Sequence, residues 1–398
     1  MQRTLLKSIA LGCAVVALFL IFDNRSGVVR ATRAQSPPQE KTVEQAEKNI
    51  KVLTGMPQSQ LIPVMNFFAA SMGRRCNYCH VNNQGQWDYA SDAKPEKAAA
   101  REMVKLVMDI NKTTERLKLD PVSCYTCHRG RTSPQSIPVL PLPLPSPPAG
   151  GPGGPTPGAS PQASPQASPA ATPALPSADE IFSKYAAAVG GQAAIDKLKS
   201  RTAKGTVTQA NGNSFQFELS QAAPDKFYLL VTTPQGTIER GFNGQVGWEK
   251  TARGVREITG AELINFKTAN GLFSLLKLKE QYSKPPRVRK DKLGDRDVYI
   301  VDGTTNDNRR MRLYFDATSG LLLRRTTTMQ TIVGIIPDQI EFEDYREADG
   351  LKFPFTSRAA TLELGNPTST RTFTEVKLNV PIDESKFNMP EPPKPAVP

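Results

Sequence analysis

Two short stretches hold most of the residues in this chain that could bind a metal or a cofactor. The chain has 398 residues, with five cysteines and two histidines in total. Four of the cysteines and both histidines lie in RRCNYCHV (74–81) and SCYTCHRG (123–130). Each stretch contains Cys-x-x-Cys-His, and 44 residues separate Cys79 from Cys124. In an exported chain this motif indicates covalent attachment of c-type haem.

The spacing of the motif has a chemical reason. Two thiols three residues apart can form thioether bonds to the two vinyl groups of one porphyrin, and the histidine that follows can bind the iron from the same side. We therefore expect two haem c groups per chain, the first held by Cys76, Cys79 and His80 and the second by Cys124, Cys127 and His128.

Other uses of paired cysteines account for fewer of these residues. A four-cysteine zinc site usually has 15–20 residues between its pairs, and neither zinc nor disulfides would need a histidine after each pair. A thioredoxin-like redox pair needs a βαβ setting, which the surrounding sequence does not predict. Haem attachment is the interpretation that uses every histidine in the chain.

The sixth iron ligand cannot be histidine if both histidines are proximal ligands. Methionine, another weak donor, water or an open position remain. Met65 lies eleven residues before the first motif and Met103 lies twenty-one before the second, each on a preceding predicted helix. Met108 is turned toward charged residues and Met72 is very close to the first motif, so both are poorer candidates. His/Met ligation raises the reduction potential of haem, which suits electron transfer.

The N-terminus predicts export. MQRTLLK is positively charged, and IALGCAVVALFLIF (9–22) is an apolar run of signal-peptide length. Residues 1–34 are therefore expected to be a signal peptide or an uncleaved N-terminal signal anchor. Either outcome places the rest of the chain in the periplasm, free or anchored to the inner membrane.

Composition divides the exported part into two domains. Residues 133–177 are dominated by Pro, Ser, Ala and Gly and contain no charge, which is typical of a disordered linker. Residues 40–132 precede it, with helices expected over 42–53, 57–72 and 95–119. Each Cys-x-x-Cys-His follows one of the latter two helices closely. An apolar stripe on the third helix is expected to face inward: Met103, Leu106, Val107, Ile110, Thr114 and Leu117.

Residues 178–398 begin with one helix and then alternate apolar and polar residues in short stretches, with a helical interruption around 260–280. This pattern predicts a β-rich α+β domain, a curved antiparallel sheet or half-barrel with helices against one face. The domain contains no cysteine and no histidine, so histidine-based catalysis and Cys–His nucleophiles are excluded there. The acidic stretch 341–350 is expected on the solvent face of a strand.

Residues 44–132 resemble the photosynthetic reaction-centre cytochrome c subunit family. The resemblance rests on KNIKVLTGMPQSQLIPVMNFFAASMGRRCNYCHV, on WDYASDAKPEKAAAREMVKLVMDIN and on CYTCHRG. It implies an all-α multihaem domain in which a methionine before each motif completes the iron, here Met65 and Met103. Members that serve photosystems carry four haems and this chain has two motifs, so what the resemblance implies here is the fold unit and electron carriage.

The C-terminal domain resembles the periplasmic lipoprotein-carrier superfamily. The resemblance rests on ADEIFSKYAAAVGGQAAIDKLKSRTAKGTV and on the LYFDATSGLLLRR…DYREADGLKFPF pattern. It implies a half-barrel closed by helices, with a concave apolar pocket for an acyl chain or another hydrophobe. A scaffold or protein-docking domain is the alternative.

Together these patterns predict an exported dihaem cytochrome c that carries single electrons, tethered to a binding or docking domain. The net charge of +12 favours acidic redox partner proteins, and no basic block with aromatic residues indicates nucleic acid. Two alternatives stay open: a haem enzyme or small-ligand sensor with one open iron, and a lipid-binding module with accessory haems.

Overall fold

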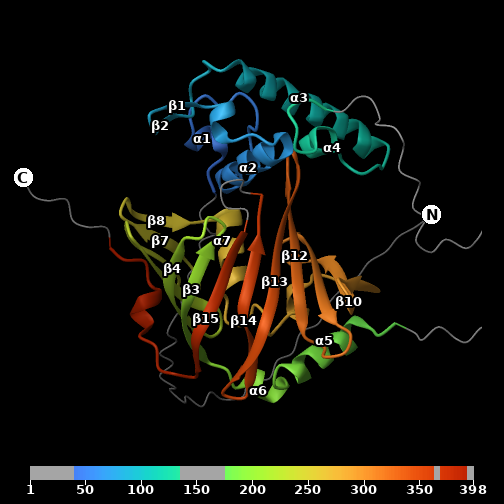
Figure 1. Cartoon of the computed structure of the whole chain (residues 1–398), viewed down its shortest axis with the longest axis vertical. Coiled ribbons are helices and arrows are strands. Elements are labelled where there is room, and N and C mark those ends of the chain that lie inside the picture. The colour runs from blue at the N-terminus through green and yellow to red at the C-terminus, as the bar shows by residue number, and fades with distance from the viewer. Residues whose placement is uncertain (1–39, 135–174, 363–367, 392–398) are drawn as a thin grey trace, which may run out of the picture. The chain divides into compact units, whose positions relative to one another are not determined.

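The computed structural model describes residues 40–134, 175–362 and 368–391, which form a helical region followed by a sheet domain (Figure 1). The predicted signal segment 1–34 and most of the predicted linker 133–177 lie outside the described residues. Within the described residues, no helix combines the length and the hydropathy needed to span a bilayer.

The helical region contains two substantial helices and several short elements. The helices are α2 (Leu61–Met72) and α3 (Pro95–Arg116). The short elements are α1 (Val43–Ala46), η1 (Gln58–Gln60), η2 (Cys76–Tyr78), the hairpin of β1 (Val81–Asn83) and β2 (Gln86–Asp88), and α4 (Cys124–His128). The expected helix over 42–53 is wrong beyond its first turn, because Asn49 and Leu53 adopt positive φ angles of 59° and 65°.

A close backbone contact joins the ends of the two helix–motif units. Gly73 ends α2 in the left-handed conformation (φ 63°), and its amide hydrogen bonds the carbonyl of Ala69. Gly130, just after the second motif, donates its N–H to the carbonyl of Ser71 at 2.8 Å. A Cβ atom on Gly73 would lie 2.2 Å from the carbonyl oxygen of Gly130, so only glycine permits this approach.

The buried cluster of the helical region is small. It contains Val43, Leu53, Met56, Val64, Phe67 and Val104. It also includes Val333 from the turn between β12 and β13 and Ile336 near the start of β13. The stripe expected to face inward on α3 does so only in part. Val107 is 6% exposed, whereas Met103, Leu106, Ile110 and Leu117 are 38–52% exposed. The polypeptide of this region therefore leaves much of its apolar surface uncovered.

The sheet domain is one open antiparallel sheet of thirteen strands in the order β8-β7-β6-β5-β4-β3-β15-β14-β13-β12-β11-β10-β9. The strands are β3 (Ser200–Gln209), β4 (Ser214–Ala222), β5 (Lys226–Thr233), β6 (Gly236–Phe242), β7 (Gly247–Thr251), β8 (Gly254–Ile258), β9 (Arg287–Leu293), β10 (Arg296–Thr304), β11 (Arg310–Asp316), β12 (Leu322–Thr331), β13 (Gly334–Ala348), β14 (Leu351–Ala360) and β15 (Thr368–Leu378). The helices are α5 (Ala178–Ala188), α6 (Gln192–Asp196) and α7 (Gly260–Asn270), with 3-10 turns η3 (Lys279–Gln281) and η4 (Glu384–Phe387).

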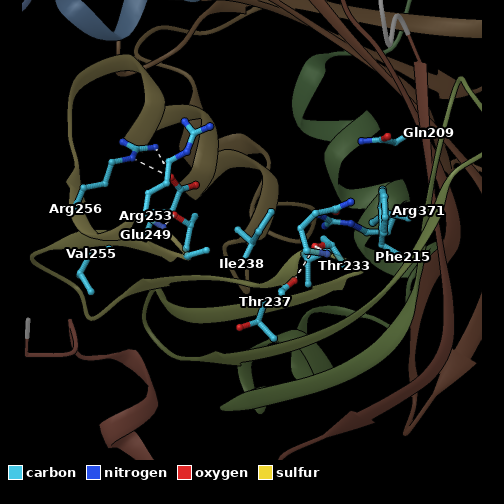
Figure 2. Close-up of a pocket in the computed structure, with 17 residues that line it drawn as sticks. Gln209, Phe215, Thr233, Thr237, Ile238, Glu249, Arg253, Val255, Arg256 and Arg371 are labelled. Atoms are coloured by element: carbon cyan, nitrogen blue, oxygen red, sulfur yellow. Dashed lines mark hydrogen bonds and ion pairs between the residues drawn. The ribbon is translucent and has the colours of Figure 1, made fainter. Parts of the chain in front are cut away.

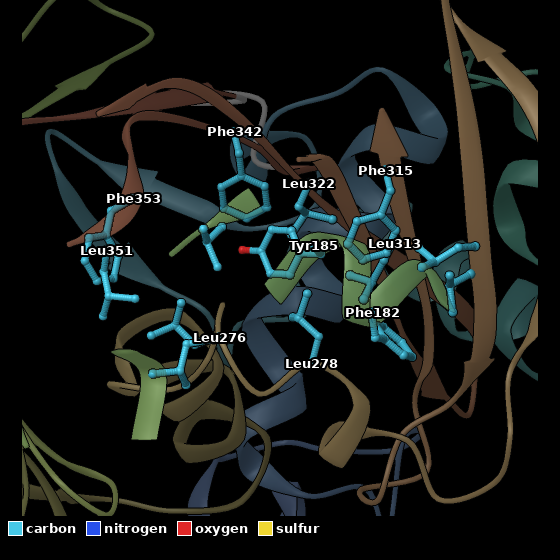
Figure 3. Packing of buried hydrophobic residues seen from close by; sticks show 14 of the residues in the cluster. Phe182, Tyr185, Leu276, Leu278, Leu313, Phe315, Leu322, Phe342, Leu351 and Phe353 are labelled. Carbon is cyan, nitrogen blue, oxygen red and sulfur yellow. The ribbon is translucent and has the colours of Figure 1, made fainter. Parts of the chain in front are cut away.

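Two apolar cores lie on one face of this sheet. Leu351, Phe353 and Phe355 alternate along β14 and point to the same side, as the two-residue period of a strand requires. The first two belong to a core that includes Phe182 and Tyr185 of α5 (Figure 3). Phe355 belongs to the second core, which includes Phe266 of α7. The predicted fold class, a helical region followed by a curved antiparallel sheet with helices on one face, is confirmed.

The Gly73–Gly130 contact yields a stability prediction. We expect Gly73→Ala to lower the thermal unfolding midpoint of the helical region more than Gly55→Ala does. Both glycines have positive φ angles, 63° and 77°, so alanine costs about 1–2 kcal/mol of backbone strain at either site. Only at Gly73 does the new methyl group also meet a backbone oxygen, whereas nothing lies within 4 Å of a Cβ at Gly55. Melting followed by circular dichroism measures the difference, and equal losses would contradict it.

Candidate functional site

The second motif lies on α4, at one wall of a cleft between helices. Ser123 begins α4 with a capping box, in which Thr126 Oγ1 accepts the backbone N–H of Ser123 at 3.0 Å. Cys124 and His128 line a cleft of about 150 Å³ together with apolar side chains of α2 and α3, among them Phe68, Met72, Met103 and Val104. Cys127 is exposed.

The ring of His128 is oriented as an iron ligand requires. Its Nδ1 lies 2.9 Å from the carbonyl oxygen of Arg131, which can only accept a hydrogen bond. Nδ1 therefore carries the proton and Nε2 keeps its lone pair, the arrangement seen when a backbone carbonyl orients a metal-binding histidine.

Two methionines face this motif across the cleft. Met103 of α3 was predicted from the sequence, and it lines the cleft with His128. Met72 of α2 lines the same cleft, although its proximity to the first motif made it a poorer candidate from the sequence. Sequence distance misled here because the Gly73 turn and the Gly130 contact bring the end of α2 against the second motif. The rejected candidate Met108 packs against the buried cluster.

The first motif begins on η2 and borders a separate, wider cleft. Cys76 lines a cleft of about 760 Å³ with Trp87, Arg75 and Lys94. Met65, the predicted distal ligand of the first haem, is not among the residues that line this cleft, and it packs against the buried cluster of the helical region. The structure therefore places Met103 and His128 on one cleft, and Met65 does not line the cleft at Cys76.

His80 lies behind this cleft against an aromatic pair. The rings of Tyr89 and His80 are in an edge-to-face arrangement with 5.3 Å between their centroids. The ring of Trp87 stacks on that of Tyr89, with 5.4 Å between centroids. His80 Nδ1 is buried without a hydrogen-bond partner among the described residues. Burial, with the positive charge of Lys97, lowers the pKa of His80, so its neutral form is favoured. A neutral imidazole is the form that binds iron.

The loop that carries Tyr89 is held by charged groups. Lys97 of α3 donates to the carbonyl oxygens of Tyr89 and Ser91, each at 2.8 Å. Asp92 accepts from Lys51 at 2.7 Å and from Arg101 at 2.8 Å. These contacts tie the loop both to α3 and to the chain before α2.

The residues of the helical region fit haem. The cleft at Cys124 and His128 is apolar, and nine of the twelve large apolar side chains that are exposed in the described structure lie in this region: Ile62, Trp87, Tyr89, Met103, Leu106, Ile110, Leu117, Leu119 and Tyr125. A covalently bound macrocycle would cover such side chains. The cleft at the second motif is smaller than the roughly 300–1,000 Å³ of a typical cofactor site, so its walls must separate to admit one.

The zinc and redox alternatives find little support in the geometry. Within the described residues, no three His, Cys, Asp or Glu side chains converge to hold a metal ion. Burial raises the pKa of the Cys124 thiol to about 11 and also raises that of Cys79. Reactive dithiols instead have lowered thiol pKa values.

Comparison with known proteins agrees with the cytochrome interpretation of this region. Residues 18–145 match the family described as photosynthetic reaction centre cytochrome C subunit. A reaction center cytochrome c subunit of Rubrivivax gelatinosus is 33% identical over 98 residues, which are 23% of this chain and 25% of that protein. Cytochrome c-554 of Chloroflexus aurantiacus is 36% identical over 88 residues, 21% of this chain and 20% of that one. The chain thus spans a quarter or less of these relatives.

Solved structures similar to this chain include a DUF1329 family protein from Desulfovibrio piger and a LolA superfamily protein from Nitrosomonas europaea. Each is 12% identical with a TM-score of 0.39; they cover 53% and 54% of this chain, and 96% and 98% of their own lengths. The family match confirms the resemblance predicted for residues 44–132.

The Asp92 contacts predict an acid-dependent contribution to stability. Hydrogen bonds from Lys51 and Arg101 hold the pKa of Asp92 well below its usual range. A carboxylate with a depressed folded-state pKa stabilises the fold above its unfolded-state pKa, and the contribution is lost as pH falls toward the folded-state value. We expect Asp92→Asn to lower the unfolding midpoint at pH 7, and the deficit to shrink below about pH 4.

The matched control is Glu102→Gln. Glu102 pairs with Lys105 on the exposed surface of α3, with both side chains more than half exposed, so its loss should change little. Thermal melts of the three proteins at pH 7, 5 and 3 measure the effect. An Asp92→Asn deficit that stays constant over this range would contradict the assignment.

Proposed function

We propose that residues 40–132 form a dihaem cytochrome c domain that carries single electrons between redox partners. Cys76 and Cys79 would hold one haem and Cys124 and Cys127 the other, with His80 and His128 as iron ligands. The observation that carries this proposal is the second motif, where His128 Nδ1 is held by the Arg131 carbonyl and Met103 lies across the same cleft. Bound haem would supply a one-electron Fe(III)/Fe(II) couple.

The protein's own residues would do three things for such a carrier. The Arg131 carbonyl would fix the tautomer of His128, and the apolar side chains of α2 and α3 would exclude water from the cleft. Met103 or Met72 would hold the iron through its sulfur. Full coordination with low water access suits electron transfer, because it leaves no iron position for substrate. We assign no catalytic residue.

The remaining assignments follow the sequence. We propose that the chain is exported to the periplasm by residues 1–34, with these residues removed or kept as an inner-membrane anchor. The linker 133–177 would tether the sheet domain as a binding or docking module. The net charge of +12 favours acidic redox partner proteins.

One observation favours a second candidate at the first motif. Met65 packs against the buried cluster and does not line the cleft beside Cys76. If no methionine reaches that iron, the first haem would have an open position and could bind a small ligand, as in a sensor or haem enzyme. Carbon monoxide binding to the reduced protein separates the two candidates. An iron with every coordination position filled by the protein would exclude carbon monoxide, whereas an iron with a vacant position would bind it rapidly.

The haem count is tested by removing one attachment site. We expect the exported wild-type protein to carry two haems, and the double variant Cys76→Ala/Cys79→Ala to carry one. Pyridine haemochrome analysis gives the stoichiometry, and intact-mass spectrometry gives the added mass. The converse variant, Cys124→Ala/Cys127→Ala, is the matched control and should also retain one haem. A wild-type protein with no haem, or with one, would contradict the proposal.

The distal ligand of the second haem is tested with carbon monoxide. We expect Met103→Leu to open that iron, so that the reduced variant binds carbon monoxide and its reduction potential falls. Met108→Leu is the control, because Met108 lies on the same helix but packs in the buried cluster. Met72→Leu tests the other methionine of the cleft. If neither Met103→Leu nor Met72→Leu changes carbon monoxide binding, methionine ligation at the second motif is wrong.

A further inference from the structure

Three arginines on the inner face of the sheet have no acidic partner. Arg201 of β3, Arg325 of β12 and Arg371 of β15 line one cavity of about 170 Å³, which α7 and residues 274–275 close from the other side. Among the described residues, none of the three guanidinium groups lies in an ion pair, although twenty-four ion pairs occur elsewhere. Arg325 is 4% exposed and Arg201 and Arg371 are half-buried, positions in which arginines without an acidic partner are rare.

Aromatic rings and the end of α7 hold these guanidinium groups in place. Arg201 lies over the ring of Phe353 at 4.8 Å, Arg371 over Phe217 at 5.3 Å and Arg325 over Phe342 at 5.9 Å. These contacts fix the planes of the groups and supply no negative charge.

Their hydrogen bonds to protein are few. Arg201 Nε donates to Gln221 Oε1 at 2.5 Å, Arg371 donates to Asn270 Oδ1 at 3.3 Å, and Arg325 donates to the Thr268 carbonyl at 3.5 Å. Each guanidinium has five N–H donors, so most donors of the set have no protein partner in these contacts. The acceptors are neutral, and they lie at or near the C-terminal end of α7.

The site is strongly cationic at neutral pH. Burial lowers the pKa of each of the three arginines to about 10, which leaves all of them protonated. Arg371 further lowers the pKa of Arg201, since the two carry like charge. Asp338 interacts with Arg325 but is not within ion-pair distance, and its own pKa is raised by burial. A bound anion would offset this uncompensated charge.

The cavity continues into an apolar groove. Val207 and Arg371 line both the cavity and a groove of about 810 Å³ on β3 to β8. The groove is lined by Phe215, Val231, Ile238 and Val255, and also by polar and charged side chains that include Glu249, Arg253 and Arg256. In Figure 2, Arg371 and Phe215 lie at one end of the groove and Arg256 at the other, with Ile238 between them. Its volume lies within the range of sites that hold small molecules, roughly 300–1,000 Å³.

We propose that the sheet domain binds an anionic amphiphile, with an acyl chain in the groove and a carboxylate or phosphate head against Arg201, Arg325 and Arg371. Guanidinium groups bind both kinds of head through charge-assisted hydrogen bonds. The proposal rests on the binding role suggested for this domain and not on the haems. It narrows the expected ligand, because the predicted apolar pocket would take any hydrophobe, whereas three arginines would favour one with negative charge.

The sequence contains a signal for this site. Along β3, Arg201 lies an even number of residues from Ala203 and Val207, and along β15 Arg371 lies two residues from Phe373. Residues two apart in a strand point to the same face, so these arginines had to point into the core. An arginine on the solvent face lies an odd number of residues from the core-facing positions, as Arg358 does on β14.

The test measures selectivity on the full exported protein after lipid removal. Isothermal titration calorimetry with palmitate, palmitoyl lysophosphatidate and hexadecanol compares three ligands that have the same acyl or alkyl chain length and differ in the head group. We expect at least one of the two anions to bind about tenfold or more tightly than the neutral alcohol, because each hydrogen bond to a charged group is worth on the order of 1.5–3 kcal/mol. The tighter anion identifies the head group. No binding of either anion, or equal affinity for all three, would overturn the proposal.

Variants separate ligand recognition from a purely structural role of the arginines. We expect Arg371→Gln to weaken the anion about tenfold and leave hexadecanol unchanged, and Arg371→Lys to retain part of the selectivity. Arg358→Gln, which removes an exposed arginine paired with Glu343, is the control and should match wild type. If Arg371→Gln folds and keeps the wild-type selectivity, the arginine site is wrong.

If Arg371→Gln does not fold, the wild-type protein still gives a decision. Raising the salt concentration should weaken binding of the anion relative to the alcohol, because salt screens charge. A ratio independent of salt would again overturn the proposal. Haem content measured on the same samples keeps this result separate from the electron-transfer proposal, since amphiphile binding should not depend on haem occupancy.

Discussion

The helical region leaves many of its apolar side chains exposed, and the rest of its structure depends on this constraint. Leu106 and Ile110 of α3 and Leu117 at its C-terminal end are exposed. The buried cluster is small, and one of its members, Val333, belongs to the sheet domain. Small helical domains usually need a staple such as a metal, a disulfide or a cofactor. Two covalently bound macrocycles would cover this surface, so attachment and folding of the region are expected to be coupled.

The contact between Gly73 and Gly130 makes the two attachment motifs one unit. It places the last turn of α2 beside α4, so that side chains of the helix preceding the first motif line the cleft of the second. The same contact explains why Met72 becomes a neighbour of His128.

The sheet domain has charged side chains beside its apolar cores. Its thirteen strands place two apolar cores on one face, one against α5 and one against α7, and the arginine cavity is lined by members of both, Phe342 and Phe373. Aromatic rings hold the guanidinium groups there without neutralising them. A domain that keeps uncompensated positive charge inside its curved face gives up stability, and anion binding is the use of that charge that the geometry supports.

The sequence by itself determined the fold class, since period-two alternation and helix punctuation are local patterns. It also contains both Cys-x-x-Cys-His motifs, from which haem attachment is predicted, because that motif needs only local spacing. It misjudged residues 47–53, where Asn49 and Leu53 take left-handed conformations that propensity does not predict. Only the tertiary structure decided which methionines line the cleft of the second motif and which arginines line one cavity from β3, β12 and β15. Such contacts depend on turns and strand order that join residues far apart in the chain.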